Sequence, residues 1–197
     1  TPDQLAAWNK AYEPKNKAFQ EANPQGDDLV RWKYQQYMKD YLRCVASVDD
    51  NVGRVLRFLD AEGLADNTIL VFTSDHGEMF GAHGRAAKYI FYEEAARVPM
   101  LIRWPSRIRG GSRSDALLGT PDIMPTLLGL AGLPAPDSAQ GTNYAPLIAG
   151  KVKDAAQPAA LLNLPASFSV VRRQGFAEYR GVRTPRRTLR WDREPIP

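Results

Sequence analysis

The protein has 197 residues, of which 44% are hydrophobic and 24% are charged, with a formal net charge of +4. A chain of this length can bury a core as one domain, and no apolar run approaches the ~20 residues that cross a bilayer, so neither a membrane span nor a membrane partner is expected. The single cysteine, Cys44, excludes an internal disulfide. The basic excess belongs to residues 170–197, which carry eight arginines against three acids.

Residues 1–26 are polar and are interrupted by Pro2, Pro14 and Pro24. Because proline breaks regular structure, this stretch is predicted to be a connecting arm with one or two helical turns.

A long amphipathic helix is predicted next, with Asp27 or Asp28 as the N-cap and Gly63 as the C-cap. Between these caps, apolar residues recur at spacings of three and four: Val30, Tyr34, Tyr37, Tyr41, Val45, Val48, Val52, Val55 and Leu59. This spacing predicts one buried helix face. Cys44 lies within the helix and is predicted to be a buried structural thiol.

The short apolar run Ile69–Phe72 is typical of a strand that is buried on both faces of a parallel sheet. Together with the preceding helix it predicts a doubly wound α/β fold. Asp75 and His76 follow directly, at the strand end where open α/β sheets bind ligands. The loop then contains three glycines, which allow a close backbone approach to a ligand: Gly77, Gly81 and Gly84.

Asp75 is the first candidate metal ligand, because carboxylates suit hard divalent cations such as Ca²⁺ and Mg²⁺. His76 leaves the identity of the metal undecided, because imidazole is better suited to Mn²⁺ or Zn²⁺. Both histidines of the protein, His76 and His83, fall in this loop. The ordinary alternative is that Asp75 caps a turn and that the histidines pack or face water.

The remaining predicted elements are short. They are a helix over Phe91–Ala96, a strand over Val98–Trp104, a helix that begins at Thr120-Pro121-Asp122 and ends at Gly132, a helix over Tyr144–Ala149, and strands over Ala159–Leu162, Phe176–Tyr179 and Gly181–Thr184. Arg97 is predicted to pair with Glu93 or Glu94 across one helical turn.

Several of these motifs resemble those of a known family. Four stretches carry the resemblance: Val71-Phe72-Thr73-Ser74-Asp75-His76-Gly77-Glu78, Gly81-Ala82-His83-Gly84, Lys88, and Tyr92-Glu93-Glu94-Ala95-Ala96-Arg97-Val98-Pro99. Together they resemble the C-terminal half of the sulfatases, in the alkaline phosphatase superfamily. The resemblance implies part of an α/β/α sandwich with the start of a small C-terminal antiparallel sheet. Residues 1–26 would be the connecting arm, 27–165 the C-terminal part of the α/β domain, and 166–197 the start of the antiparallel subdomain.

The resemblance also implies an activity, the metal-dependent hydrolysis of aryl or carbohydrate sulfate esters. Asp75 and His76 would bind the metal, with Ca²⁺ the first expectation and Mg²⁺, Mn²⁺ and Zn²⁺ the alternatives. Lys88 would contact the sulfate, and His83 is a further candidate that would line the pocket, support a ligand or hold the loop.

The nucleophile of sulfatases is a formylglycine made from cysteine in a Cys-x-Pro-Ser-Arg or Cys-x-Ala-x-Arg context. Here Val48 stands where Cys44 would need an arginine. Formylglycine and two further metal carboxylates are therefore expected outside this chain, and the chain alone is expected to be inactive and to self-associate through exposed apolar surface. The sequence assigns no compartment; the family makes the periplasm or secretion an expectation.

Two alternatives stay open. Phosphonate and phosphodiester hydrolases on the same scaffold also carry Asp-His at this position. The second alternative is a non-catalytic anion-binding module that uses the arginines of residues 170–197. The ordinary interpretation of these arginines is a pair of strands with solvated side chains, and no nucleic-acid partner is expected because aromatic residues are not interleaved with them.

Overall fold

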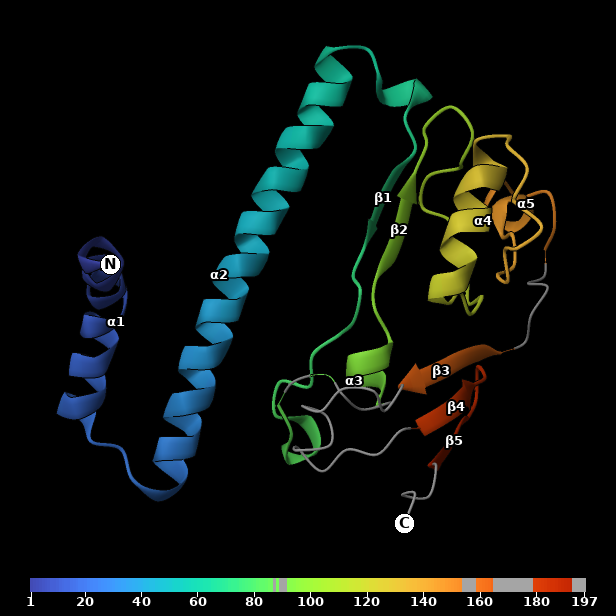
Figure 1. Cartoon of the computed structure of the whole chain (residues 1–197). Coiled ribbons are helices and arrows are strands. Elements are labelled where there is room, and N and C mark those ends of the chain that lie inside the picture. Colours follow the sequence, from blue (N-terminus) through green and yellow to red (C-terminus); the bar gives the residue numbers. More distant parts are fainter. Residues whose placement is uncertain (87, 89–91, 154–158, 165–178, 193–197) are drawn as a thin grey trace. The chain divides into compact units, whose positions relative to one another are not determined.

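The computed structural model describes residues 1–86, 88, 92–153, 159–164 and 179–192 (Figure 1). The chain divides into two compact units, residues 1–55 and residues 56–197. Among the described helices, none combines the length and the apolar character needed to cross a membrane.

The first unit begins with helix α1 (Pro2–Ala22), so the prediction of only one or two helical turns in residues 1–26 is wrong. Pro2 lies in the first turn, where a helix needs no backbone donor, and Thr1 forms a capping box with Gln4. Asn23 ends the helix in the left-handed conformation. Pro2 thus begins the helix, Pro24 follows its end, and only Pro14 lies in its interior.

Helix α2 (Gly26–Ala61) confirms the predicted long helix. It begins one residue before Asp27, which therefore lies in the first turn and is not the cap. Gly63 ends the helix as predicted, at φ +66° with its N–H donated to the Asp60 carbonyl. Side-chain contacts join α1 to α2: the Phe19 and Trp32 rings lie 4.8 Å apart. The hydrogen bond from Lys15 Nζ lowers the pKa of Asp40 below its ordinary value.

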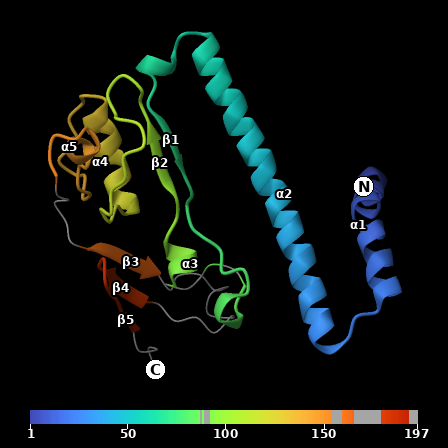
Figure 2. The same ribbon diagram turned by 180° about the vertical axis from the view of Figure 1, so that it is seen from behind.

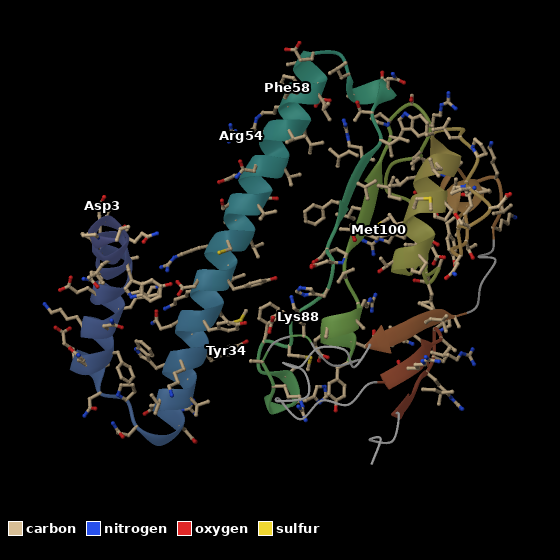
Figure 3. All side chains as sticks on the ribbon, viewed as in Figure 1. Asp3, Tyr34, Arg54, Phe58, Lys88 and Met100 are labelled. Carbon is tan, nitrogen blue, oxygen red and sulfur yellow. The ribbon has the colours of Figure 1, made fainter. Side chains whose placement is uncertain are left out.

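The predicted burial of the apolar face of α2 is wrong, because this helix has no buried residue. Seven residues of that face are between 41% and 66% exposed: Val30, Tyr34, Tyr37, Tyr41, Val45, Val48 and Val55. The labelled side chains of Tyr34 and Phe58 project outward from α2 (Figure 3). Cys44 is also exposed and is not the buried thiol that was predicted. The periodicity identifies which face is apolar but not what covers it.

In the second unit, strand β1 (Leu70–Thr73) follows the short 3-10 helix η1 (Ala65–Asn67), and it pairs with β2 (Met100–Arg103). The pairing is antiparallel, with Val71 opposite Ile102, so the prediction of a parallel neighbour is wrong within the described residues. β1 is also only partly buried. A continuous apolar run supplies side chains to both faces of a strand but does not determine the direction of its partner.

Helices α4 (Thr120–Leu130) and α5 (Ala145–Ile148) cover one face of this strand pair. Their contact forms a core of Trp104, Leu130 and Ala145, against which partly buried aliphatic residues pack: Ile69, Ile102, Ile108, Leu127 and Ile148. β1 and β2 run side by side next to α4 in both views (Figures 1 and 2). Leu101, on the opposite face of β2, is 62% exposed.

The end of α4 is joined to the loop before α5 by buried hydrogen bonds. Thr126 is fully buried, and its hydroxyl accepts the Tyr144 N–H at 2.9 Å and donates to the Thr142 carbonyl at 3.3 Å. Asp122 accepts two further backbone N–H groups, from Gly119 at 2.8 Å and from Thr142 at 2.7 Å. This network fixes the packing of the two helices that support β1 and β2.

A second sheet contains β3 (Ala160–Leu164), β4 (Tyr179–Arg183) and β5 (Thr188–Asp192), in that order and antiparallel. It confirms the predicted change to antiparallel strands near the C-terminus, but the predicted break between residues 179 and 181 is wrong, because β4 is continuous through Arg180. Residues 176–178 of one predicted strand lie outside the described residues.

Helix α3 (Glu93–Ala96) holds the loop that follows β1. Its predicted start at residue 91 lies outside the described residues. The Gly77 N–H donates to the Ala95 carbonyl at 2.8 Å, and buried Ala95 packs against buried Met79. A Cβ on Gly77 would lie only 1.9 Å from the Glu94 carbonyl oxygen. Glycine is therefore the residue that lets the loop approach α3 this closely.

Replacing the buried hydroxyl in Thr126→Val leaves the Tyr144 N–H without its acceptor, and we expect a loss of about 1–3 kcal/mol in the free energy of unfolding. Chemical denaturation measures the loss. Thr126→Ser is the matched control, because it keeps the hydroxyl and removes only a methyl, at about 0.8 kcal/mol. Equal losses in the two variants would contradict a role for this hydrogen bond.

Gly77→Ala is expected to lower the free energy of unfolding by about 1–3 kcal/mol, because the new methyl collides with backbone that cannot move independently of α3. Gly110→Ala is the matched control, since a Cβ at Gly110 meets no atom within 4 Å. Denaturation curves of the two variants that coincide would show that the close approach to α3 is not needed.

Candidate functional site

The candidate site begins where β1 ends, in the three residues Ser74, Asp75 and His76. The Ser74 hydroxyl donates to the His76 carbonyl at 2.8 Å, and the His76 N–H donates to Asp75 Oδ1 at 3.0 Å. These bonds turn the chain sharply after the strand. One oxygen of Asp75 thus caps the turn, as the ordinary interpretation expected, while Oδ2 stays available for another partner.

The hydrogen bonds of His76 determine which ring nitrogen can bind a ligand. Nδ1 lies 2.8 Å from the Gly77 carbonyl oxygen, which can only accept, so Nδ1 carries a proton. In the neutral ring, Nε2 then presents its lone pair. A backbone carbonyl that holds one imidazole nitrogen in this way is the usual support for a metal-binding histidine.

Three of the four predicted site residues meet at this lone pair. Asp75 Oδ2 lies 3.3 Å from His76 Nε2, and the Lys88 ammonium also contacts Nε2. Lys88, labelled in Figure 3, is partly buried, whereas the Asp75 side chain is 82% exposed. The arrangement places a carboxylate, an imidazole acceptor and a cation within hydrogen-bonding distance of one point.

The donor set fits a divalent cation in part. A separation of 3.3 Å between Asp75 Oδ2 and His76 Nε2 suits two adjacent ligands that each lie about 2.3 Å from one ion. Within the part of the chain that the structure describes, no group of three or more His, Cys, Asp or Glu side chains could hold a metal. Asp75 and His76 therefore supply two positions of a coordination shell, and a complete shell needs other ligands.

His83 belongs to a second group of contacts and is the middle residue of the short 3-10 helix η2 (Ala82–Gly84). Its ring stacks on Tyr92 with centroids 4.0 Å apart, and Nε2 lies 3.8 Å from Glu94 Oε1, an ion pair only when the imidazole is protonated. His83 has φ +54°, a left-handed conformation that is uncommon for a residue with a side chain. These contacts connect the loop to α3.

Sequence analysis missed the partner of Glu93. We predicted that Arg97 would pair with Glu93 or Glu94; instead Arg183 Nε donates to Glu93 Oε1 at 2.5 Å, and Glu94 lies beside His83. The alternation of residues 181–184 predicts a strand but carries no signal for a partner 90 residues away. The pair becomes visible only in the folded chain.

Comparison with known proteins gives relatives along most of the chain. An N-acetylglucosamine-6-O-sulfatase from Bacteroides thetaiotaomicron is 40% identical over 173 residues, which cover 85% of this chain and 31% of that protein. The chain thus spans about a third of the length of the relative it matches.

Solved structures share the fold. A protein in complex with its substrate D-glucosamine-2-N,6-O-disulfate matches with a TM-score of 0.84 and 36% identity, over 96% of this chain and 38% of that one. A phosphonate monoester hydrolase from Silicibacter pomeroyi matches with a TM-score of 0.63 and 30% identity, over 74% of this chain and 30% of that one.

Two family models cover the segments that carry the candidate site. A sulfatase model matches residues 7–133, and a model of the C-terminal region of N-sulphoglucosamine sulphohydrolase matches residues 81–187. The predicted fold class is confirmed, since the structural neighbours are sulfatases with the alkaline-phosphatase-like α/β fold. This chain belongs to the sulfatase family, of the alkaline phosphatase superfamily.

Proposed function

We propose that this chain contributes the metal-binding and anion-binding side chains of a hydrolase that cleaves sulfate esters. The observation that carries the proposal is the meeting of Asp75, His76 and Lys88 at the end of β1, in a member of the sulfatase family. Sulfate-ester hydrolysis needs a cation to hold the sulfate oxygens and stabilise the charge that develops on them.

Asp75 and His76 are the proposed metal ligands, through Oδ2 and Nε2. When bound, a divalent cation supplies Lewis-acid stabilisation of the sulfate oxygens. Ca²⁺ is the first choice and Mg²⁺, Mn²⁺ and Zn²⁺ are the alternatives, because the carboxylate favours hard cations and the imidazole softer ones. The Gly77 carbonyl keeps the proton of His76 on Nδ1, away from the ligating nitrogen.

Lys88 is the proposed sulfate-binding residue. In the structure its ammonium donates to His76 Nε2, the same lone pair that a metal requires. If His76 held a metal through Nε2, the three donors of Lys88 Nζ would be available for an anion at the same point. A compact ammonium suits the oxygens of a transferring sulfuryl group.

The nucleophile and the remaining metal ligands are proposed to lie outside this chain. Cys44 is exposed and lacks the arginine at position 48 that a formylglycine context requires. The chain by itself is therefore proposed to be inactive. His83 is proposed to support the loop through its contacts with Tyr92 and Glu94.

A carbohydrate sulfate is the proposed substrate class. The support comes from relatives: one is an N-acetylglucosamine-6-O-sulfatase, and a structural neighbour was solved with a disulfated glucosamine as its substrate. The N-acetylglucosamine-6-O-sulfatase matches over 85% of this chain, whereas an arylsulfatase of the same 40% identity matches over 55%, which favours a sulfated amino sugar over an aryl sulfate.

In the full-length protein, Asp75→Ala is expected to abolish binding of the divalent metal, whereas Lys88→Ala is expected to keep the metal and lower turnover roughly a hundredfold. Metal content by elemental analysis and hydrolysis rates for a sulfated glucosamine measure the two effects. Asp137→Ala and Lys151→Ala are matched controls that remove the same groups from exposed positions. Full metal content in Asp75→Ala would show that the ligand assignment is wrong.

A phosphonate or phosphodiester hydrolase is the second candidate, because a phosphonate monoester hydrolase shares the fold at 30% identity. We expect the full-length protein to hydrolyse a sulfate ester with a higher kcat/KM than a phosphonate monoester of the same alcohol. Using one alcohol for both keeps the leaving group constant, so the ratio reports the transferred group alone. A ratio that favours the phosphonate would replace the first candidate with the second.

A further inference from the structure

The second sheet carries an arginine whose contacts lead to the candidate site. Arg183 is the last residue of β4, and its side chain is 24% exposed, which is unusual for the arginine of a solvated strand. Its Nε donates to Glu93 Oε1 at 2.5 Å, and its Nη1 donates to the Thr184 carbonyl. Among the described residues, this is the ion pair that joins the second sheet to α3.

Glu93 begins α3, and α3 contacts the loop after β1 at several points. The Ala95 carbonyl accepts the Gly77 N–H. The Glu94 carbonyl oxygen occupies the space that a side chain at position 77 would need. Met79 packs on Ala95 in a small buried cluster. A shift of α3 therefore displaces the backbone of Gly77.

Gly77 in turn sets the position of the imidazole, because its carbonyl accepts the Nδ1 proton of His76. The chain of contacts runs from Arg183 through Glu93, α3 and Gly77 to His76, and each step is a hydrogen bond or a direct covalent neighbour. A helix of four residues has little stability of its own, so its orientation depends on such external contacts.

We propose that Arg183 is a positioning residue: by holding Glu93 it fixes α3 against Gly77, and so orients His76 for its ligand. The role at a metal rests on the proposed function, whereas the link from Arg183 to Gly77 does not. The pair is charge-assisted and only partly exposed, so it is stronger than most surface ion pairs.

The test is residue-level hydrogen–deuterium exchange in the full-length protein. Arg183→Ala is expected to speed exchange of the Gly77 amide about fivefold, because the hydrogen bond to Ala95 opens more often. Arg186→Ala is the matched control, since Arg186 is an exposed arginine between β4 and β5, and it should leave the rate unchanged. Equal Gly77 exchange in the two variants would overturn the proposal.

Further variants separate positioning from general stability. Glu93→Gln keeps an acceptor oxygen but removes the charge, so it should raise Gly77 exchange above the native rate, and this test holds even if Arg183→Ala fails to fold. The double variant Arg183→Glu, Glu93→Arg swaps the two charges, and its hydrogen exchange at Gly77 should be slower than that of Arg183→Glu alone. A double variant as fast as the single one would show that the two residues do not act as a pair.

The dependence of hydrolysis on metal concentration tests whether the link from Arg183 to Gly77 also acts on the candidate site. In Arg183→Ala the metal concentration for half-maximal hydrolysis should rise about fivefold, while Arg186→Ala keeps the native value. Faster Gly77 exchange with an unchanged metal requirement would overturn the step from loop to metal. Faster Gly77 exchange in a protein that hydrolyses no sulfate ester would support the link and refute the proposed function.

Discussion

The candidate site depends on the close approach of two backbone segments, in which Gly77 lies against α3. The Gly77 N–H donates to the Ala95 carbonyl, and because Gly77 has no side chain, the Glu94 carbonyl can lie close to the loop. His76 directly precedes this contact and donates its ring proton to the Gly77 carbonyl. An imidazole held through backbone on one side can present its other nitrogen in a fixed direction, which a flexible loop could not achieve.

How far the sequence predicts this site depends on the sequence distance between the partners. Asp75 and His76 are adjacent and follow an apolar run, so their place at a strand end is readable from local pattern. Lys88 is twelve residues away, and only its place in a family motif brings it to the same point. Arg183 is ninety residues from Glu93 and has no local signal at all, since an arginine in an alternating strand is usually solvated.

The errors in the fold share a physical cause, because hydrophobic pattern reports the preference of a face and not the neighbour that covers it. The apolar residues of α2 have the predicted helical spacing, yet their face is exposed. In the β1–β2 pair, one face is covered by α4 and α5, and Leu101 of β2 is exposed on the other face. These exposures are those of the chain by itself, and the relative it matches is about three times as long. The C-cap signal at Gly63 was correct, because it acts within a few residues, whereas the helix begins one residue before the predicted cap at Asp27.

Under the proposed function, Lys88 and a divalent cation would both use the same nitrogen, His76 Nε2. The Lys88 ammonium contacts His76 Nε2, which lies 3.3 Å from Asp75 Oδ2, so the carboxylate has a positive charge nearby. If Asp75 and His76 held a divalent cation through Oδ2 and Nε2, Lys88 Nζ would be available to donate to an anion. Under the proposed function, the lysine that lies beside Asp75 and His76 in the structure would also donate hydrogen bonds to a sulfate oxygen next to a bound cation.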